Sequence, residues 1–210
     1  MKLSNFQLPY DVKYAHNIFS SISKDNCPVT LDVGCGYGEK TLLFKALSCD
    51  IVGLDVSIEK AKKAKEKGIE VLVGDAEHLP FKNEIFGAVT VFHVIEHIND
   101  AAKMLNETYR VLQEGGFSIF VTPNKRRLTF IISLFIRILK PKMKYPLNPD
   151  HVFEYSKKDL WVLLLRSKFR SYYLSPLVFG VISSRHTFGL KRPPKILSNF
   201  CSQWFVYAKK

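Results

Sequence analysis

Three glycines in the segment Asp32–Gly38, which reads DVGCGYG, are the first residues of this chain whose spacing suggests chemistry. Gly34, Gly36 and Gly38 follow a short apolar run, and glycine at such a turn lets the backbone come close to a ligand. A dinucleotide site would have a glycine at the position of Glu39, where pyrophosphate meets the start of a helix. A glutamate there opposes phosphate, so the loop favours a ligand without phosphates.

Two carboxylates, one at the end of a later apolar run and one just after the next run, strengthen this interpretation. Asp55 comes about 20 residues after the glycines, where a carboxylate can accept both hydroxyls of a ribose. Asp75, followed by Ala76, is placed to accept from an adenine amino group. The plain alternatives are a helix cap at Asp55 and a turn residue at Asp75. The glycine loop, Asp55 and Asp75 are all compatible with the same ligand, S-adenosylmethionine, which offers an ammonium, a sulfonium, a ribose and an adenine.

A third group, His93-Val-Ile-Glu96-His97, has the H-x-x-E-H pattern of inverted zinc peptidases. Two histidines four residues apart can bind zinc from one face of a helix. The group directly follows an apolar run, however, and a zinc site would leave the glycine loop unexplained, so we assign no metal ligand. His97 and His151 are instead the candidates for a general base, because imidazole titrates near neutral pH. The alternative for His97 is a residue that only caps a turn.

The elements that position these residues follow from hydrophobic periodicity. Five apolar runs have the length of buried strands: Val29–Val33, Ile51–Val56, Ile69–Val73, Gly87–Phe92 and Phe117–Val121. Three helices are expected between them: Glu39–Leu47, Ile58–Lys67 with Ser57 as cap and Gly68 as stop, and Asp100–Leu112 closed by Gly115-Gly116. The alternation predicts an α/β fold with a parallel sheet and a ligand at the carboxyl ends of its strands.

The rest of the chain predicts one more helix and two strands. The helix is Ser156–Ser167, and the strands are Arg170–Leu174 and Trp204–Ala208. Arg126–Leu139 is an apolar stretch with basic flanks, and Pro193-Pro194 breaks the chain further on. We expect one domain over residues 1–210, with a lid inserted at about residues 125–150.

Several segments resemble the motifs of class I S-adenosylmethionine-dependent methyltransferases, in particular the small-molecule group that includes quinone-biosynthesis enzymes. They are LDVGCGYGEKT, GLDVS, VGDAEHLPF, FGAVTVFHVIEHIND and VLQEGGFSIFVTPN. The match is dense over residues 29–124 and thin beyond, where DHVFEYSKKDL resembles a recurring segment.

The resemblance implies a Rossmann-like, doubly wound sheet of seven strands, mostly parallel with an antiparallel last strand. It also implies in-line methyl transfer to the oxygen or carbon of a small, lipophilic acceptor. The residues that we then expect to line the cofactor site are Asp32, Gly34, Cys35, Gly36, Gly38, Asp55, Val56, Asp75, Ala76, Phe92 and His93.

Charge is divided unevenly along the chain. Residues 1–123 have a net charge of −3 and residues 124–210 a net charge of +15, which together give the +12 of the whole chain. Such asymmetry predicts an anionic partner: a membrane surface, nucleic acid or an acidic substrate. The basic, apolar Arg126–Leu139 favours a lid that contacts lipid or admits a lipophilic substrate. The alternative is a lid packed on its own domain or on a second copy.

Nucleic acid is less favoured, because no RNA-binding module is recognisable. An enzyme that methylates RNA or protein through the basic C-terminal half is the alternative to one that acts on a small molecule. A subunit that binds S-adenosylmethionine without catalysis is a further alternative. No apolar run reaches the ~18 residues that span a bilayer, and the first ten residues lack the order of a signal peptide. Four cysteines form no C-x-x-C pair and are expected to be free thiols: Cys27, Cys35, Cys49 and Cys201. We therefore expect a cytoplasmic protein, in part peripheral at a membrane.

Overall fold

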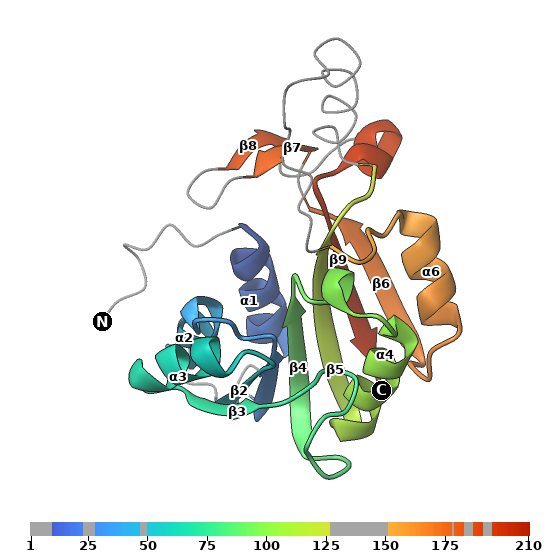
Figure 1. Cartoon of the computed structure of the whole chain (residues 1–210). Coiled ribbons are helices and arrows are strands. Elements are labelled where there is room, and N and C mark those ends of the chain that lie inside the picture. The colour runs from blue at the N-terminus through green and yellow to red at the C-terminus, as the bar shows by residue number, and fades with distance from the viewer. Residues whose placement is uncertain are drawn as a thin grey trace.

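A seven-stranded sheet organises the chain in the computed structural model, which describes residues 10–22, 28–46, 50–126, 151–177, 179–182, 187–190 and 195–210. The strands are β1 (Thr30–Val33), β2 (Ile51–Asp55), β3 (Glu70–Val73), β4 (Phe86–Phe92), β5 (Leu112–Pro123), β6 (Ser171–Pro176) and β9 (Gln203–Lys209). Their order is β3-β2-β1-β4-β5-β9-β6. Strands β1 to β5 pair in parallel, and β9 runs antiparallel to both of its neighbours (Figure 1). The predicted Rossmann-like topology is confirmed.

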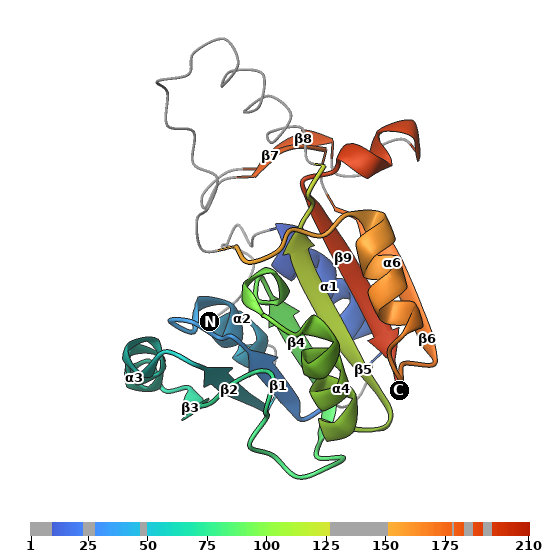
Figure 2. The ribbon, with the colours of Figure 1, turned by 45° about the vertical axis from the view of Figure 1, so that its right-hand side comes forward.

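Helices cover both faces of this sheet. Helices α1 (Tyr10–Ile22) and α2 (Glu39–Lys45) pack on one face through a cluster that includes Phe19 and Phe44. Helices α4 (Ala101–Val111) and α6 (Lys157–Leu165) cover the other face through Met104 and Leu160 (Figure 2). Because β4 alternates side chains between the two clusters, its backbone is buried from both sides, as in doubly wound folds.

Local capping explains where two helices begin. Helix α3 (Ile58–Glu66) starts after Ser57, whose hydroxyl accepts a hydrogen bond from the N–H of Lys60 over 3.3 Å. Helix α6 starts after Ser156, which forms a capping box with Asp159. These boundaries agree with those predicted from the sequence to within one or two residues.

The glycine pair Gly115-Gly116 does not have the role predicted for it. Strand β5 begins directly after α4, and its pairing with β4 jumps from Phe86–Leu112 to Ala88–Phe117. The pair therefore lies in a bulge within the strand, not in a turn before it. A side chain on Gly116 would meet two backbone carbonyl oxygens at about 3 Å, which explains the glycine.

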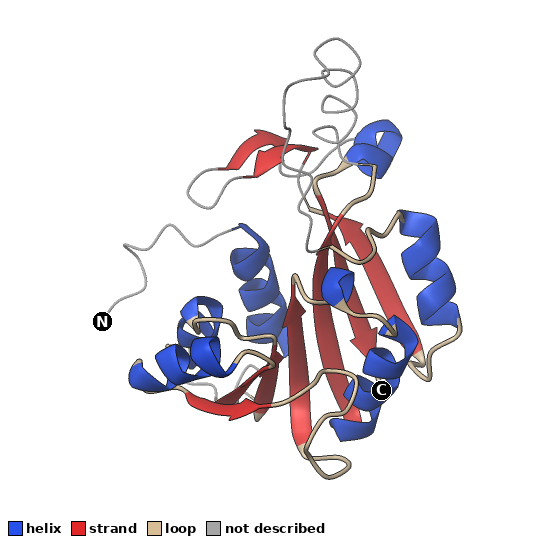
Figure 3. Cartoon of the chain, viewed as in Figure 1, coloured by secondary structure: helices blue, strands red, loops and turns tan. Residues whose placement is uncertain are grey.

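Three further elements were not predicted. Helix α1 precedes the first strand, a hairpin joins β7 (Phe179–Ile182) to β8 (Thr187–Leu190), and the 3-10 helix η3 (Lys195–Phe200) precedes β9. The hairpin and η3 lie beyond the end of the sheet at which β4 and β5 terminate (Figure 1). The segment between β3 and β4 contains no helix and is a loop (Figure 3).

Two of the predicted features cannot be compared with the structure. The lid expected at residues 125–150 lies outside the described residues, apart from Lys125 and Arg126, as does Pro193-Pro194. Within the described ranges, no helix is both long and apolar enough to cross a membrane.

Candidate active site

The three glycines after β1 have positive φ angles but different surroundings. The φ values are 71° at Gly34, 57° at Gly36 and 81° at Gly38. A side chain on Gly34 would overlap Val94, and one on Gly38 would overlap Ile69. A side chain on Gly36 would meet nothing within 4 Å. Gly34 and Gly38 thus permit close packing, whereas Gly36 leaves its backbone open to a ligand.

The carboxylate of Asp55 is fixed beside that open backbone. Its Oδ2 accepts from the N–H of Gly36 over 2.8 Å, and its Oδ1 accepts from the N–H of Ser57 over 2.9 Å. Each carboxylate oxygen has capacity for a further hydrogen bond, such as one from a ribose hydroxyl. The next side chain, Val56, is 75% exposed and offers an apolar surface at the same edge of the sheet. An open backbone, an anchored carboxylate and an apolar surface together fit S-adenosylmethionine.

The loop that carries Asp75 and Ala76 is tied down within itself and to neighbouring segments. Oδ1 of Asp75 accepts from the N–H of Glu77 over 2.8 Å, and Ala76 is buried in the core. Oε1 of Glu77 accepts from the N–H groups of Asn99 and Asp100, each over 3.1 Å. The loop after β3 is therefore joined to the start of α4, and the Asp75 side chain is held at the sheet's carboxyl edge.

Three residues predicted to line the cofactor site have buried side chains. Asp32 is buried and accepts from the hydroxyls of Thr41 and Thr90 over 2.6 and 2.8 Å; burial raises its pKa. Burial, with the charges of Asp32 and Asp55, raises the pKa of the Cys35 thiol to about 12. Phe92 is buried against α2. Their side chains support the site from the core, and a direct role toward the cofactor stays a prediction.

His93 marks a sharp bend at the end of β4. Its φ is 57°, which is uncommon for a residue other than glycine. Its Nε2 lies 3.1 Å from Nε2 of Gln203 and 3.7 Å from Oδ2 of Asp11. Burial lowers the pKa of His93, but the hydrogen bonds to Asp11 and Glu96 outweigh it and raise the pKa overall. His93 thus belongs to a largely buried polar cluster.

The same bend overturns the zinc-peptidase alternative. His97 lies in the short 3-10 helix η2 (Ile95–His97), whereas His93 precedes it in left-handed backbone. The two histidines do not share the face of one α-helix, so the H-x-x-E-H spacing does not place both on one metal.

His97 and His151, the two predicted bases, lie side by side. Their rings are 4.9 Å apart at 76° to each other. The approach is fixed by the backbone, since the carbonyl of Glu96 accepts from the N–H groups of Val152 and Phe153 over 2.8 and 3.1 Å. Two residues that are distant in sequence are thereby brought together beside η2. Their role as bases stays a prediction.

Sequence reasoning missed Asp11 of α1. Lys40 of α2 donates to Oδ2 of Asp11 over 2.7 Å, and His93 faces the same oxygen. Burial alone would raise the pKa of Asp11, but hydrogen bonds with His93 and Lys40 and the charge of Lys40 hold it well below its usual value. No motif identifies Asp11, because its contacts with Lys40 and His93 depend on where α1 packs.

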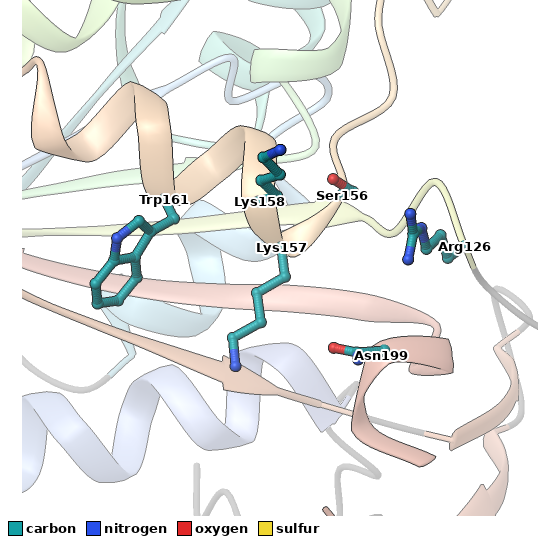
Figure 4. A pocket seen from close by; sticks show the side chains of 6 residues that line it. All are labelled: Arg126, Ser156, Lys157, Lys158, Trp161 and Asn199. Carbon is teal, nitrogen blue, oxygen red and sulfur yellow. The ribbon is translucent and has the colours of Figure 1, made fainter. Parts of the chain in front are cut away.

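A separate pocket of about 330 Å³ lies where α6 begins, close to the end of β5 and to η3 (Figure 4). It is lined by Arg126, Ser156, Lys157, Lys158, Trp161 and Asn199. None of the predicted cofactor residues lines it. Its three cations and one indole make it a distinct basic surface.

Comparisons with known proteins identify the family of the chain. The family model described as "Methyltransferase domain" matches residues 31–120. The demethylmenaquinone methyltransferase of Thermotoga maritima is 30% identical over 176 residues, which cover 71% of this chain and 76% of that protein. The mitochondrial ubiquinone biosynthesis O-methyltransferase of Rattus norvegicus is 32% identical over 114 residues, covering 50% of this chain and 33% of that protein.

A solved structure agrees on the fold. A methyltransferase from Thermotoga maritima, described as a possible histamine N-methyltransferase, superposes with a TM-score of 0.73 at 19% identity, covering 96% of this chain and 88% of that one. The chain spans only 43% and 49% of the length of two other curated relatives. This chain covers about three quarters of the demethylmenaquinone methyltransferase, and it shares the fold and the glycine loop of such enzymes. The chain therefore belongs to the class I S-adenosylmethionine-dependent methyltransferases.

Proposed function

We propose that this protein transfers the methyl group of S-adenosylmethionine to an oxygen or carbon atom of a small, lipophilic acceptor. The observation that carries the proposal is the open backbone of Gly36 beside the anchored carboxylate of Asp55. The similarity to two methyltransferases of quinone biosynthesis supports a lipophilic acceptor.

Each loop has a separate task in binding. Asp55 would accept from the ribose hydroxyls, Asp75 from the adenine amino group, and Val56 would cover an adenine face. Gly36 lets the backbone approach without a side chain in the way. The bound cofactor supplies an electrophilic methyl group on its sulfonium. The protein then has to hold the acceptor atom in line and keep water away.

The two histidines are the candidate general bases for the methyl acceptor. If the acceptor is a hydroxyl, His97 or His151 would accept its proton as the new bond forms. His97 is exposed and can reach a substrate, whereas His151 is partly buried. A carbon acceptor that is already nucleophilic would need neither.

Calorimetry with S-adenosylmethionine tests the first half of the proposal. Asp55→Asn keeps the size of the side chain and removes its charge, so affinity should fall at least about tenfold, the value of one charged hydrogen bond. Glu66→Gln changes an exposed carboxylate at the end of α3 and should bind like the wild type. Thermal unfolding of each variant shows that it is folded. Equal affinity in Asp55→Asn and the wild type would contradict the assignment.

The acceptor can be found with labelled cofactor. The enzyme is incubated with a lipid extract and methyl-labelled S-adenosylmethionine, and the products are separated by mass spectrometry. Label in a quinone-like or phenolic lipid supports the proposal. Label in RNA or protein only, or cofactor binding without any transfer, supports the alternatives of a macromolecular substrate or a non-catalytic subunit.

We also propose that α6 contacts an anionic membrane surface. Trp161 and Leu165, one helical turn apart, are 46% and 60% exposed, and Lys157 and Lys158 lie beside them. An apolar face bordered by lysines suits an interface of acidic lipid. Vesicles containing phosphatidylserine should co-float the wild type at low salt and lose Trp161→Glu/Leu165→Glu. Binding to RNA but not to vesicles would reject the membrane in favour of nucleic acid.

A further inference from the structure

We propose that the pocket at the start of α6 binds the phosphate group of a phosphorylated, lipophilic methyl acceptor. The pocket has a volume of about 330 Å³, at the lower end of the roughly 300–1,000 Å³ that is typical of small-molecule sites. Binding of a phosphate ester in this pocket stands on the structure alone, whereas the identity of that ester as the methyl acceptor rests on the proposed function.

The three cations of the pocket are the first observation. No ion pair between described residues involves Arg126, Lys157 or Lys158. Lys63 and Lys67, by contrast, each pair with a glutamate on the surface. Cations that gather without a counter-charge repel one another, and an anion that binds among them relieves this repulsion.

The balance of charge favours a phosphate monoester over a carboxylate. One acid, Asp159, lies at the same helix start, where its Oδ2 accepts from the N–H and the hydroxyl of Ser156 over 2.8 and 2.7 Å. Burial raises the pKa of Asp159, but the hydrogen bonds from Ser156 and the charges of Lys125 and Arg126 outweigh it and hold the pKa below its usual value. The three lining cations and this carboxylate leave a net charge of +2. A phosphate monoester has a charge of about −1.5 to −2 at pH 7 and neutralises it.

A buried asparagine holds two walls of the pocket together. The side chain of Asn124 accepts from the N–H of Arg126 over 3.0 Å and donates to the carbonyl of Asn199 over 2.9 Å. The end of β5 and η3 are thereby fixed against each other on the side of the pocket that faces α6. A guanidinium presented from such a backbone can donate to two phosphate oxygens at once.

An apolar surface adjoins the cations. Figure 4 shows Trp161 at one end of the group and Arg126 at the other, with the two lysines between them. Trp161 is 46% exposed, and its ring meets that of Tyr172 edge-on, with the centroids 5.5 Å apart. Leu165, one helical turn further along α6, is 60% exposed. A ligand whose phosphate lies among the cations can therefore place an apolar chain over the indole, which favours a lipophilic ester.

One short segment connects the pocket to the proposed bases. It runs from His151 to Lys157, and the carbonyl of Glu96 accepts from two backbone N–H groups near its start. Near its other end, the carbonyl of Tyr155 accepts from the N–H of Lys125 over 3.1 Å. Six residues span at most about 20 Å. An acceptor whose phosphate and reacting atom are separated by less than this can occupy both sites at once.

Tryptophan fluorescence tests the pocket, because the chain has two tryptophans and Trp204 is only 1% exposed. The full chain is titrated at low salt with octyl phosphate, with inorganic phosphate and with octanol. We expect a saturable change with octyl phosphate, weaker binding of inorganic phosphate, and no saturable change with octanol over the same concentrations. Trp161→Phe should remove the signal, while calorimetry should still detect octyl phosphate.

Substitutions on two walls locate the site. Arg126→Gln and Lys157→Gln should each weaken binding of octyl phosphate at least about tenfold, the value of one charged hydrogen bond. Arg166→Gln changes an exposed arginine directly after the far end of α6 and should bind like the wild type. Thermal unfolding shows that each variant is folded. Equal affinity of Arg126→Gln, Lys157→Gln and the wild type, or an equal loss in Arg166→Gln, would overturn the pocket.

Vesicles distinguish a soluble phosphate ester from a lipid headgroup. Leu165 does not line the pocket, so Leu165→Ser should reduce flotation with vesicles that contain phosphatidic acid and keep the affinity for octyl phosphate. A loss of octyl phosphate binding as large as the loss of flotation would assign phosphate recognition to the membrane-facing side of α6 and overturn the acceptor pocket.

Calorimetry with S-adenosylmethionine on the same samples separates this proposal from the proposed function. Protein that binds the cofactor but not octyl phosphate overturns the pocket and leaves the proposed function intact. Protein that binds octyl phosphate through Arg126 and Lys157 but no cofactor supports the phosphate site and contradicts the function, and with it the role of the pocket for a methyl acceptor.

Discussion

The backbone N–H of Gly36 donates to the carboxylate of Asp55 over 2.8 Å, which joins the turn after β1 to the end of β2. The two residues are neighbours because β1 and β2 pair in parallel, with Asp32 opposite Gly53 and Val33 opposite Leu54. The hydrogen bond positions the charge of Asp55 beside a backbone that no side chain covers. It therefore links the geometry of the glycine loop to the charge that would recognise a ribose.

Gly36→Ala should weaken cofactor binding and lower the free energy of unfolding no more than alanine does at another glycine of the same backbone conformation. Gly68 provides a matched control, since both glycines have positive φ and a side chain on either would meet nothing within 4 Å. Alanine in left-handed backbone costs roughly 1–2 kcal/mol at each position. Urea unfolding should thus give similar losses, whereas calorimetry should show weaker binding of S-adenosylmethionine only for Gly36→Ala. Equal affinities in the two variants would mean that the cofactor does not approach Gly36.

Gly34→Ala should destabilise the fold more than Gly36→Ala, because the new methyl group overlaps Val94. Overpacking of this kind costs about 1–3 kcal/mol beyond the backbone strain. Gly34→Ala/Val94→Ala should regain part of this loss, since the second change removes the overlapping atoms. The check is a double-mutant cycle by urea unfolding. Strictly additive effects would show that the two side chains do not meet.

Arg110→Met should loosen the loop between β3 and β4. Arg110 of α4 donates to the carbonyl groups of Leu79 and Phe81 over 3.0 and 2.7 Å, and pairs with Glu107 over 2.7 Å. Loss of hydrogen bonds from a charged donor costs about 1.5–3 kcal/mol. Hydrogen exchange should rise at residues 77–83. Arg166→Met changes an exposed arginine directly after α6 and is the control. Unchanged exchange in Arg110→Met would show that these hydrogen bonds do not hold the loop.

The sequence allowed the five parallel strands and the binding loops to be predicted, because both depend on local patterns. Apolar runs of five or six residues identify the strands, and a glycine or aspartate at the end of a run or just after it identifies the loop there. Ser57 and Ser156 located helix starts for the same reason. Loop positions alone did not reveal which way each side chain points: Cys35 and Phe92 both pack inward, and their contact with the cofactor stays a prediction.

The remainder depends on contacts between distant segments. Asp11 and Gln203 reach His93 only because α1 and β9 pack at the end of β4. The approach of His151 to His97 depends on two backbone hydrogen bonds to Glu96. No residue pattern within any of these segments records such contacts. Gly115-Gly116 was mispredicted for the same reason. A glycine pair is compatible with a turn and with a bulge, and only the pairing of β5 with β4 distinguishes the two.

Acid should weaken the fold through Asp11. The pKa of Asp11 is held well below its unfolded value of about 3.9, chiefly by His93 and Lys40 acting against burial. A folded pKa below the unfolded one gives stability that is present above about pH 4 and lost as the pH falls toward the folded value. Urea unfolding should show a decline between pH 5 and pH 3 that is shallower in Asp11→Asn, which should already have lost about 1.5–3 kcal/mol at pH 6. Glu59→Gln is the control, because Glu59 pairs with Lys63 at the same 2.7 Å but on the surface, where such pairs contribute little. Identical pH profiles for Asp11→Asn and the wild type would show that α1 is not held by this charge.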